Sequence, residues 1–293
     1  MNSRSLFVSS CATAGLLVLM GAGCRGGAPA PRPTPADPTA IFGTPEGEAT
    51  STTRDTAPVI TRCNHEYFPL RLGYHIQYHT TYPAAMGTSG NGEYALQVMR
   101  VTENSAYVKS AIQRSGGGAP IESDVEYRCI DGGLFAAGYV NMGGFSPGGP
   151  AGDFRVDTTR ATGAFLPAHI DVGSAWEGSF TIKLTKPEGT GAEVFGRDRA
   201  TGRINESLSM DVGIKRKALG IERVRVAAGE FEAMKIGTTM SIDGHEAMTG
   251  SEWWVKDVGM VKSTMNASGA PGADNIITEA TGYYVPGAGS VRS

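Results

Sequence analysis

Short runs of alternating apolar and polar residues, joined by turn residues, constrain the fold of this chain more than any other feature. An alternation with period two places the apolar side chains on one face of a strand, and it is clear in YHIQYHTTY (residues 74–82). Asp131-Gly132 and Asp243-Gly244 each separate two apolar runs. Asp-Gly is a strong hairpin signal because a type I′ turn needs positive φ at both central residues. Beyond residue 23, no stretch of ten or more residues has the i, i+3, i+4 apolar repeat of a helix.

Runs of the same kind predict further strands along the rest of the chain. About a dozen short strands joined by hairpins predict an all-β fold with a single antiparallel domain, either a sheet curled into a barrel or half-barrel or a sandwich. Glycine, with 41 of 293 residues, is about twice as frequent as its average usage of roughly 7%, as expected of a chain with many turns. The further strands are expected within residues 93–101, 106–113, 124–140, 175–184, 202–213, 221–227, 234–255, 259–266 and 275–285.

Residues 1–23 have the plan of a signal peptide, with a positive start, an apolar stretch and small residues before Cys24. The end of this segment resembles the lipobox of bacterial lipoproteins, in which a peptidase cuts before a cysteine that carries diacylglycerol. Ala22 and Gly23 match the small residues before the cut and Cys24 matches the modified thiol, whereas Gly21 stands where the family usually has a branched apolar residue. The resemblance implies a lipid anchor on Cys24, which attaches the chain to a bacterial membrane.

The same stretch, GAGCRGG, also matches the G-x-G-x-x-G dinucleotide fingerprint. That loop needs a strand before it and a helix after it, but here an apolar leader precedes it and a proline-rich segment follows. We therefore expect no nucleotide cofactor, and indeed no cofactor of any kind.

Residues 24–58 contain seven of the chain's 16 prolines. A segment of this composition cannot bury a core, so we predict a disordered tether that holds the β domain, residues 59–285, away from the membrane surface. Residues 286–293 are expected to form a short flexible tail. Arg25 occupies the place where an aspartate would signal inner-membrane retention in some Gram-negative lipoproteins. If the bacterium that makes it is Gram-negative, the chain is therefore expected at the outer membrane, on its periplasmic side or at the cell surface.

Two cysteines, Cys63 and Cys129, fall in the predicted β domain. In an exported domain they are expected to form a disulfide, which stabilises by about 4 kcal/mol in a chain-entropy estimate. The alternative is two separate buried thiols.

The second half of the chain resembles the TapB-like lipoproteins and related exported bacterial β domains of unknown function. IERVRVAAGEFEAMKI (residues 221–236) resembles their V-x-V-x-A-G-x-F-x-A hairpin, and SEWWVKDVGMVKST (residues 251–264) their Trp-containing hairpin. Asp257 and Val258 stand where a glycine is more usual. The resemblance extends over most of residues 64–284 and implies the fold and an exported location more than an activity.

Trp253 and Trp254 are neighbours on a predicted strand, so they are expected on opposite faces of the sheet. One should lie in the core, and the other is either covered or part of a ligand or partner surface.

No motif points to catalysis or to a metal. GFSPG (residues 144–148) matches the nucleophile elbow G-x-S-x-G, but Pro147 has no backbone N–H to donate in an oxyanion hole. His75 and His79 on one strand lie roughly 13 Å apart, too far to chelate one ion, and they, like His65, are expected to be hydrogen-bonded or at the surface. We therefore expect no catalytic residues and no metal site.

The formal net charge of -3 and the lack of a basic stripe argue against nucleic-acid binding. Three functions remain open. The first is a lipid-anchored protein that presents a non-catalytic β domain for envelope interaction or structure, with an envelope protein as its partner. The second is a carrier that binds a lipid or other apolar ligand in a concave sheet. The third is a hydrolase, which would need His75, His245 and a carboxylate or serine in one pocket.

Overall fold

The fold is described from a computed structural model over residues 63–82, 90–114, 120–138, 155–185, 206–267 and 275–287. The chain separates into Met1–Pro33 and Thr34–Ser293, and every described residue belongs to the second unit. The predicted signal peptide, the tether, Cys24 and GFSPG lie outside the described residues. Within the described part, no helix has the length and apolar character needed to cross a membrane.

The described residues form an all-β fold, as the alternating pattern predicts. A two-stranded hairpin, β1 (Asn64–His65) and β2 (Phe68–Pro69), precedes a 12-stranded antiparallel sheet. The strands of that sheet, in chain order, are β3 (His75–Tyr82), β4 (Gly90–Val101), β5 (Ser105–Arg114), β6 (Ile121–Ile130), β7 (Gly133–Ala136), β8 (Arg155–Gly163), β9 (Ala175–Thr185), β10 (Ser207–Val226), β11 (Gly229–Ile242), β12 (His245–Val255), β13 (Gly259–Ala267) and β14 (Ile276–Tyr284).

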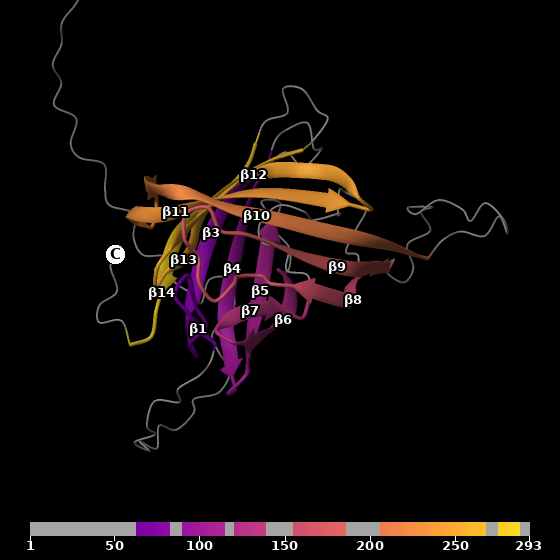
Figure 1. Ribbon diagram of the computed structural model, residues 1–293, viewed down its shortest axis with the longest axis horizontal. Coiled ribbons are helices and arrows are strands. Elements are labelled where there is room, and N and C mark those ends of the chain that lie inside the picture. Colours follow the sequence, from indigo (N-terminus) through magenta and orange to yellow (C-terminus); the bar gives the residue numbers. More distant parts are fainter. Residues whose placement is uncertain are drawn as a thin grey trace, which may run out of the picture. The chain divides into compact units, whose positions relative to one another are not determined.

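The order of strands in the sheet is β7-β6-β5-β4-β3-β14-β13-β12-β11-β10-β9-β8. Strands that follow one another in the chain are neighbours in the sheet, except for β7 and β8, which form its two ends. The first and last strands of the sheet along the chain, β3 and β14, pair with each other. Figure 1 shows β3 to β6 running down the view while β8 to β10 lie across them, so the sheet curls strongly. An isolated antiparallel bridge between Leu134 and Leu166 brings the two ends together, and the sheet is nearly closed as a barrel.

The predicted Asp-Gly turns are confirmed. Asp131 and Asp243 both have φ of 50°, and Gly132 and Gly244 both have φ of 80°, the positive values that a type I′ turn needs. Asp257 also has a positive φ, of 59°, in the turn between β12 and β13. Aspartate tolerates this left-handed region better than most residues do, which explains how it replaces the glycine that the related hairpins use.

Two strand predictions differ from the structure. Residues 202–213 and 221–227 were expected as separate strands, but β10 runs unbroken from Ser207 to Val226 with a bulge between Ala218 and Gly220. A bulge changes which residues face the core. The alternation before the bulge is therefore out of phase with the alternation after it, and the sequence resembles two strands. The sequence gives no prediction for β8, RVDTTRATG, in which none of residues 157–163 is buried, so the apolar alternation of a half-buried strand is missing.

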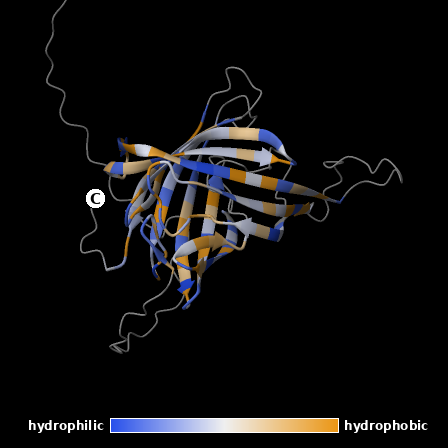
Figure 2. Ribbon diagram, viewed as in Figure 1, coloured by the Kyte–Doolittle hydropathy of each residue, from blue (hydrophilic) through white to orange (hydrophobic). Residues whose placement is uncertain are grey.

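The inner face of the curled sheet holds the core. Figure 2 shows hydrophobic and hydrophilic residues alternating along the strands, as expected when one face is buried. One end of the core is filled by aromatic rings, where Phe68 of the β1–β2 hairpin makes edge contacts with Tyr74, Tyr127 and Trp254. The largest fully buried side chains include Trp254, Tyr74, Tyr78, Tyr127, Phe68, Leu70, Ile76 and Leu96.

Candidate functional site

A charged pair lies on the inner face of the sheet. Arg216 on β10 donates from Nε and Nη2 to the two carboxylate oxygens of Glu252 on β12, each at 3.3 Å, and Trp254 Nε1 donates to the same carboxylate at 2.8 Å. The side chains of Arg216 and Glu252 are only 7% and 9% exposed. The guanidinium also lies 5.2 Å from the ring centre of Phe165. Opposite charges therefore balance each other inside the sheet.

Three inward hydroxyl groups on other strands lack a partner among the described residues: those of Tyr94, Tyr127 and Thr238. Thr238 pairs directly with Arg216 across β10 and β11. Burial raises the pKa of Tyr127, and the charge of Arg216 acts in the opposite direction. Burial also raises the pKa of Tyr94 well above its ordinary value. These groups stay neutral at physiological pH and can donate hydrogen bonds within the sheet.

The second notable feature is the seam where the two ends of the sheet meet. Among the described strands, β7 pairs with β6 alone and β8 with β9 alone. At the Leu134–Leu166 bridge, Leu134 N–H donates to Leu166 O at 2.7 Å and Phe165 N–H donates to Leu134 O at 2.8 Å. Away from this bridge, β7 and β8 form no ladder with each other in the part of the chain that the structure describes.

A pocket of about 330 Å³ lies along this seam. Its apolar residues are Ile130 on β6, Phe135 and Ala136 on β7, Ala137 beyond β7, and Ala161 on β8. Arg128, Arg160 and threonines of β8 add polar groups; the full lining is Arg128, Ile130, Phe135, Ala136, Ala137, Thr158, Thr159, Arg160, Ala161, Thr162 and Gly163. A second, more open pocket of about 340 Å³ shares Arg128 and Ile130 with it.

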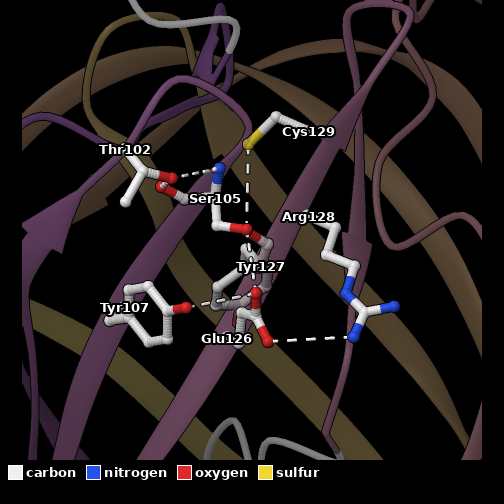
Figure 3. A network of polar contacts seen from close by, with 7 residues as sticks. All are labelled: Thr102, Ser105, Tyr107, Glu126, Tyr127, Arg128 and Cys129. Atoms are coloured by element: carbon white, nitrogen blue, oxygen red, sulfur yellow. Dashed lines mark hydrogen bonds and ion pairs between the residues drawn. The ribbon is translucent and has the colours of Figure 1, made fainter.

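Arg128 is held only loosely at the seam. The carboxylate of Glu126 accepts a hydrogen bond from Ser105 Oγ at 2.8 Å and one from Tyr107 Oη at 3.4 Å, but lies 3.9 Å from Arg128 Nη2. Figure 3 shows the guanidinium of Arg128 on the opposite side of Glu126 from Tyr107. Its side chain is 62% exposed. The arginine is therefore available to an anionic group of a partner.

Cys63 and Cys129 are joined in a disulfide that spans 66 residues of sequence. The bond ties the segment before β1 to the end of strand β6, next to Arg128 and Ile130 of the seam. The start of the described domain is therefore fixed beside the two pockets.

Trp253 and Trp254 face opposite sides of the sheet. Trp254 is fully buried among the aromatic rings of the core. Trp253 lies on the outer face, where its indole N–H donates to Glu222 and the ammonium groups of Lys235 and Lys262 lie 5.1 Å and 5.9 Å from its ring centre. These neighbours cover Trp253, which is 8% exposed, so little of either indole is available to a partner.

Three of the histidines, His65, His75 and His79, have structural partners. His65 Nε2 donates to Pro167 O at 2.8 Å, its Nδ1 accepts from Tyr67 N–H, and burial lowers its pKa. His79 pairs with Glu93, and His75 stacks on Tyr284. The described residues contain no cluster of His, Cys, Asp and Glu that could hold a metal ion.

His75 and His245 do not come together as a hydrolase would require. Each is the first residue of its strand, β3 or β12. These two strands run in opposite directions because three antiparallel pairings separate them. The two histidines therefore lie at opposite ends of the sheet.

Sequence reasoning did not find the seam or the buried pair. Glu252 stands two residues before Trp254 and so shares its face, which is a signal the sequence offers. No comparable signal exists for Arg128 and Arg160, because their proximity depends on how the sheet curls.

Residues 196–269, which include β10 to β13, match the family model described as DUF3108-like. No curated protein matches the chain. A crystal structure from Bacteroides fragilis, assigned as an exported protein with a YmcC-like fold, is 16% identical and has a TM-score of 0.50, with 75% of this chain and 99% of that chain covered. A crystal structure from Parabacteroides distasonis, assigned as a lipoprotein, is 14% identical with a TM-score of 0.49 and the same coverage.

The resemblance to exported bacterial β domains is thus supported at the level of a DUF3108-like segment and a shared fold. None of these comparisons carries the TapB name. At 16% identity, the likeness to the Bacteroides protein concerns the fold alone.

Proposed function

We propose that this chain is an exported, lipid-anchored envelope protein whose β domain has a non-catalytic, partner-binding role. The observation that carries the proposal is the seam, where a pocket of about 330 Å³ between the two ends of the sheet is lined by the half-exposed Ile130 and the exposed Arg128. The inner face, by contrast, is packed with fully buried aromatic side chains. We therefore propose the β7–β8 seam, and not the inner face, as the partner-binding surface.

Site-specific photo-crosslinking in cells tests the binding role. A photoreactive amino acid replaces Ile130, which lines the seam and is 50% exposed, or in the control Ile221, which is 64% exposed on β10. A defined crosslinked product is expected from position 130 only. Equal crosslinking at both positions, or none at either, would count against a partner at the seam.

Anchoring is tested separately. The lipobox-like end of residues 1–23 supports modification of Cys24, and an attached acyl chain gives stable membrane attachment when a second chain accompanies it. Cys24→Ala should abolish incorporation of labelled palmitate and release the chain from the membrane fraction. Continued labelling of the variant would contradict the lipid anchor on Cys24.

A second candidate is a carrier, which is favoured by three buried hydroxyl groups that have no partner among the described residues, those of Tyr94, Tyr127 and Thr238. Buried polar groups are normally hydrogen-bonded, so a ligand oxygen on the inner face would satisfy Tyr94, Tyr127 or Thr238. Native mass spectrometry of the protein taken from cells distinguishes the two candidates. A bound small molecule that is lost in Thr238→Val would support the carrier, and the unliganded mass alone would leave the partner-binding role.

A further inference from the structure

We propose that the inner face of the sheet holds a buried water site between Tyr127 on β6 and Arg216 on β10, and that this water joins the two sides of the sheet behind the Leu134–Leu166 bridge. The inference goes beyond the partner-binding role and does not depend on it.

Tyr127 and Arg216 lie against the same aromatic ring. The ring centre of Phe165 is 5.2 Å from the ring centre of Tyr127 and 5.2 Å from Arg216 Cζ. Seven strands separate β6 from β10 in the order of the sheet, so these side chains approach each other because the sheet curls. The N–H of Phe165 also donates to Leu134 O at 2.8 Å. Both polar side chains therefore lie behind the place where the ends of the sheet meet.

Other tyrosine hydroxyl groups on the inner face have protein partners. Tyr74 and Tyr78 are as deeply buried as Tyr127, and they donate to Val258 O at 2.7 Å and to Met260 O at 2.9 Å. The hydroxyl group of Tyr127 has no partner among the described residues. A buried polar group without a hydrogen bond is destabilising and rare. Tyr127 therefore requires a partner from outside the described residues.

Arg216 has donors left over. An arginine side chain carries five N–H groups, and Arg216 donates two of them to the carboxylate of Glu252. No other hydrogen bond of this side chain occurs among the described residues, although the side chain is only 7% exposed. A water molecule can accept from such an N–H and donate to a tyrosine hydroxyl at the same time. Water therefore satisfies Arg216 and Tyr127 together.

Two further hydroxyl groups can complete the site. Thr238 stands directly opposite Arg216 across β10 and β11, and Tyr94 lies on β4. Both side chains are buried, and their hydroxyl groups have no partner among the described residues. A buried water molecule makes about three hydrogen bonds to otherwise unsatisfied polar groups, and these side chains supply that number.

Charge and size favour water over a larger or charged ligand. Glu252 balances the positive charge of Arg216, so the pair has no net charge to attract an anion. Burial raises the pKa of Tyr127, whose hydroxyl is therefore neutral at physiological pH. The linings of the two pockets described above contain none of these residues. The oxygen of a small ligand would offer the same hydrogen bonds, and the crystal structure proposed next distinguishes it from water.

A crystal structure of the full chain in detergent tests the site directly. Density for a water oxygen is expected within about 3.2 Å of Tyr127 Oη and of a nitrogen of Arg216. Contact between protein side chains at this place, without such density, would overturn the proposal. Density for a larger molecule would also overturn it, because the oxygen would then belong to a ligand.

Tyr127→Phe tests the site through stability. The variant keeps the ring that packs against Phe68 and Phe165 and removes only the hydroxyl group. If water binds that hydroxyl, the urea midpoint should fall, whereas loss of an unpartnered hydroxyl should leave the midpoint unchanged or raise it. As a matched control, Tyr284→Phe removes an exposed hydroxyl on β14 and should leave the midpoint unchanged.

Amide exchange tests the link to the closure of the sheet. The N–H groups of Leu134 and Phe165 form the bridge between its ends. In Tyr127→Phe they should exchange about 5-fold faster relative to the other amides of the sheet, since one hydrogen bond is lost behind the bridge. In Tyr284→Phe their relative exchange should not change. Unchanged relative exchange in Tyr127→Phe would overturn the role in closure, and a midpoint that does not fall would overturn the water site itself.

Discussion

Arg216 and Glu252 form a bidentate ion pair on the inner face of the sheet, with both N–O distances at 3.3 Å and both side chains less than 10% exposed. They lie on β10 and β12, separated by β11, and 36 residues apart in sequence. Trp254 donates to the same carboxylate. Removal of one partner leaves an uncompensated buried charge, whereas replacement of both removes the charges together.

Glu252→Ala should therefore lower the free energy of unfolding by about 3–5 kcal/mol. The double variant Arg216→Met with Glu252→Leu should recover most of this loss, since a buried pair is often equalled by apolar residues of similar volume. Urea unfolding followed by tryptophan fluorescence measures both. As a matched control, Glu230→Ala breaks the exposed Arg223–Glu230 pair and should cost less than about 1 kcal/mol. A similar loss of unfolding free energy in Glu252→Ala and Glu230→Ala would contradict the structural importance of the buried pair.

Loss of the disulfide should also destabilise the domain. Cys63 and Cys129 close a loop of 66 residues, for which the chain-entropy model gives about 4 kcal/mol. Cys63→Ser with Cys129→Ser should lower the urea midpoint accordingly, and a reducing agent should shift the wild type to the same midpoint without affecting the variant. A variant as stable as the oxidised wild type would be inconsistent with this bond.

The stability of the domain should decrease on mild acidification because of His65. Burial lowers the pKa of this side chain below its ordinary value of 6.5, so the unfolded chain takes up a proton at a higher pH than the folded chain does. The free energy of unfolding should be unaffected by this group above about pH 6.5 and should decrease as the pH falls toward the folded-state pKa.

His65→Gln should reduce that pH dependence, measured by urea unfolding at a series of pH values. Burial lowers the pKa of His75 in the same direction, so His65→Gln with His75→Gln should reduce it further. An unchanged slope in both variants would show that neither histidine is the cause.

Two glycines offer a matched test of backbone packing. A Cβ atom on Gly250 of β12 would collide with the carbonyl oxygen of Thr264 and with Met265, whereas a Cβ on Gly282 of β14 would have no heavy atom within 4 Å. Gly250→Ala should cost about 1–3 kcal/mol through overpacking. Gly282→Ala should be neutral or stabilise by up to about 1 kcal/mol. Thermal unfolding of the two variants checks the difference, and equal melting temperatures would contradict the close approach of β12 and β13.

Local sequence was sufficient to predict most of the strands and two of the hairpin turns. The alternation in residues 74–82 predicts β3, and Asp131-Gly132 and Asp243-Gly244 predict two hairpins that the structure contains. These features depend on neighbours along the chain, namely the period of a strand and the positive φ of a type I′ turn. β8 was not predicted because none of residues 157–163 is buried and its sequence is polar, and β10 appeared as two strands because its bulge shifts the alternation.

The sequence by itself thus determined that the chain forms a large antiparallel β domain with tight hairpins, and it placed Trp253 and Trp254 on opposite faces. Only the tertiary structure decided that β3 pairs with β14, that Arg216 faces Glu252, and that the ends of the sheet leave a seam lined by Arg128 and Arg160. Hairpins require only local register, whereas these contacts join residues far apart in the chain and depend on how much a 12-stranded sheet twists and curls before its edges meet.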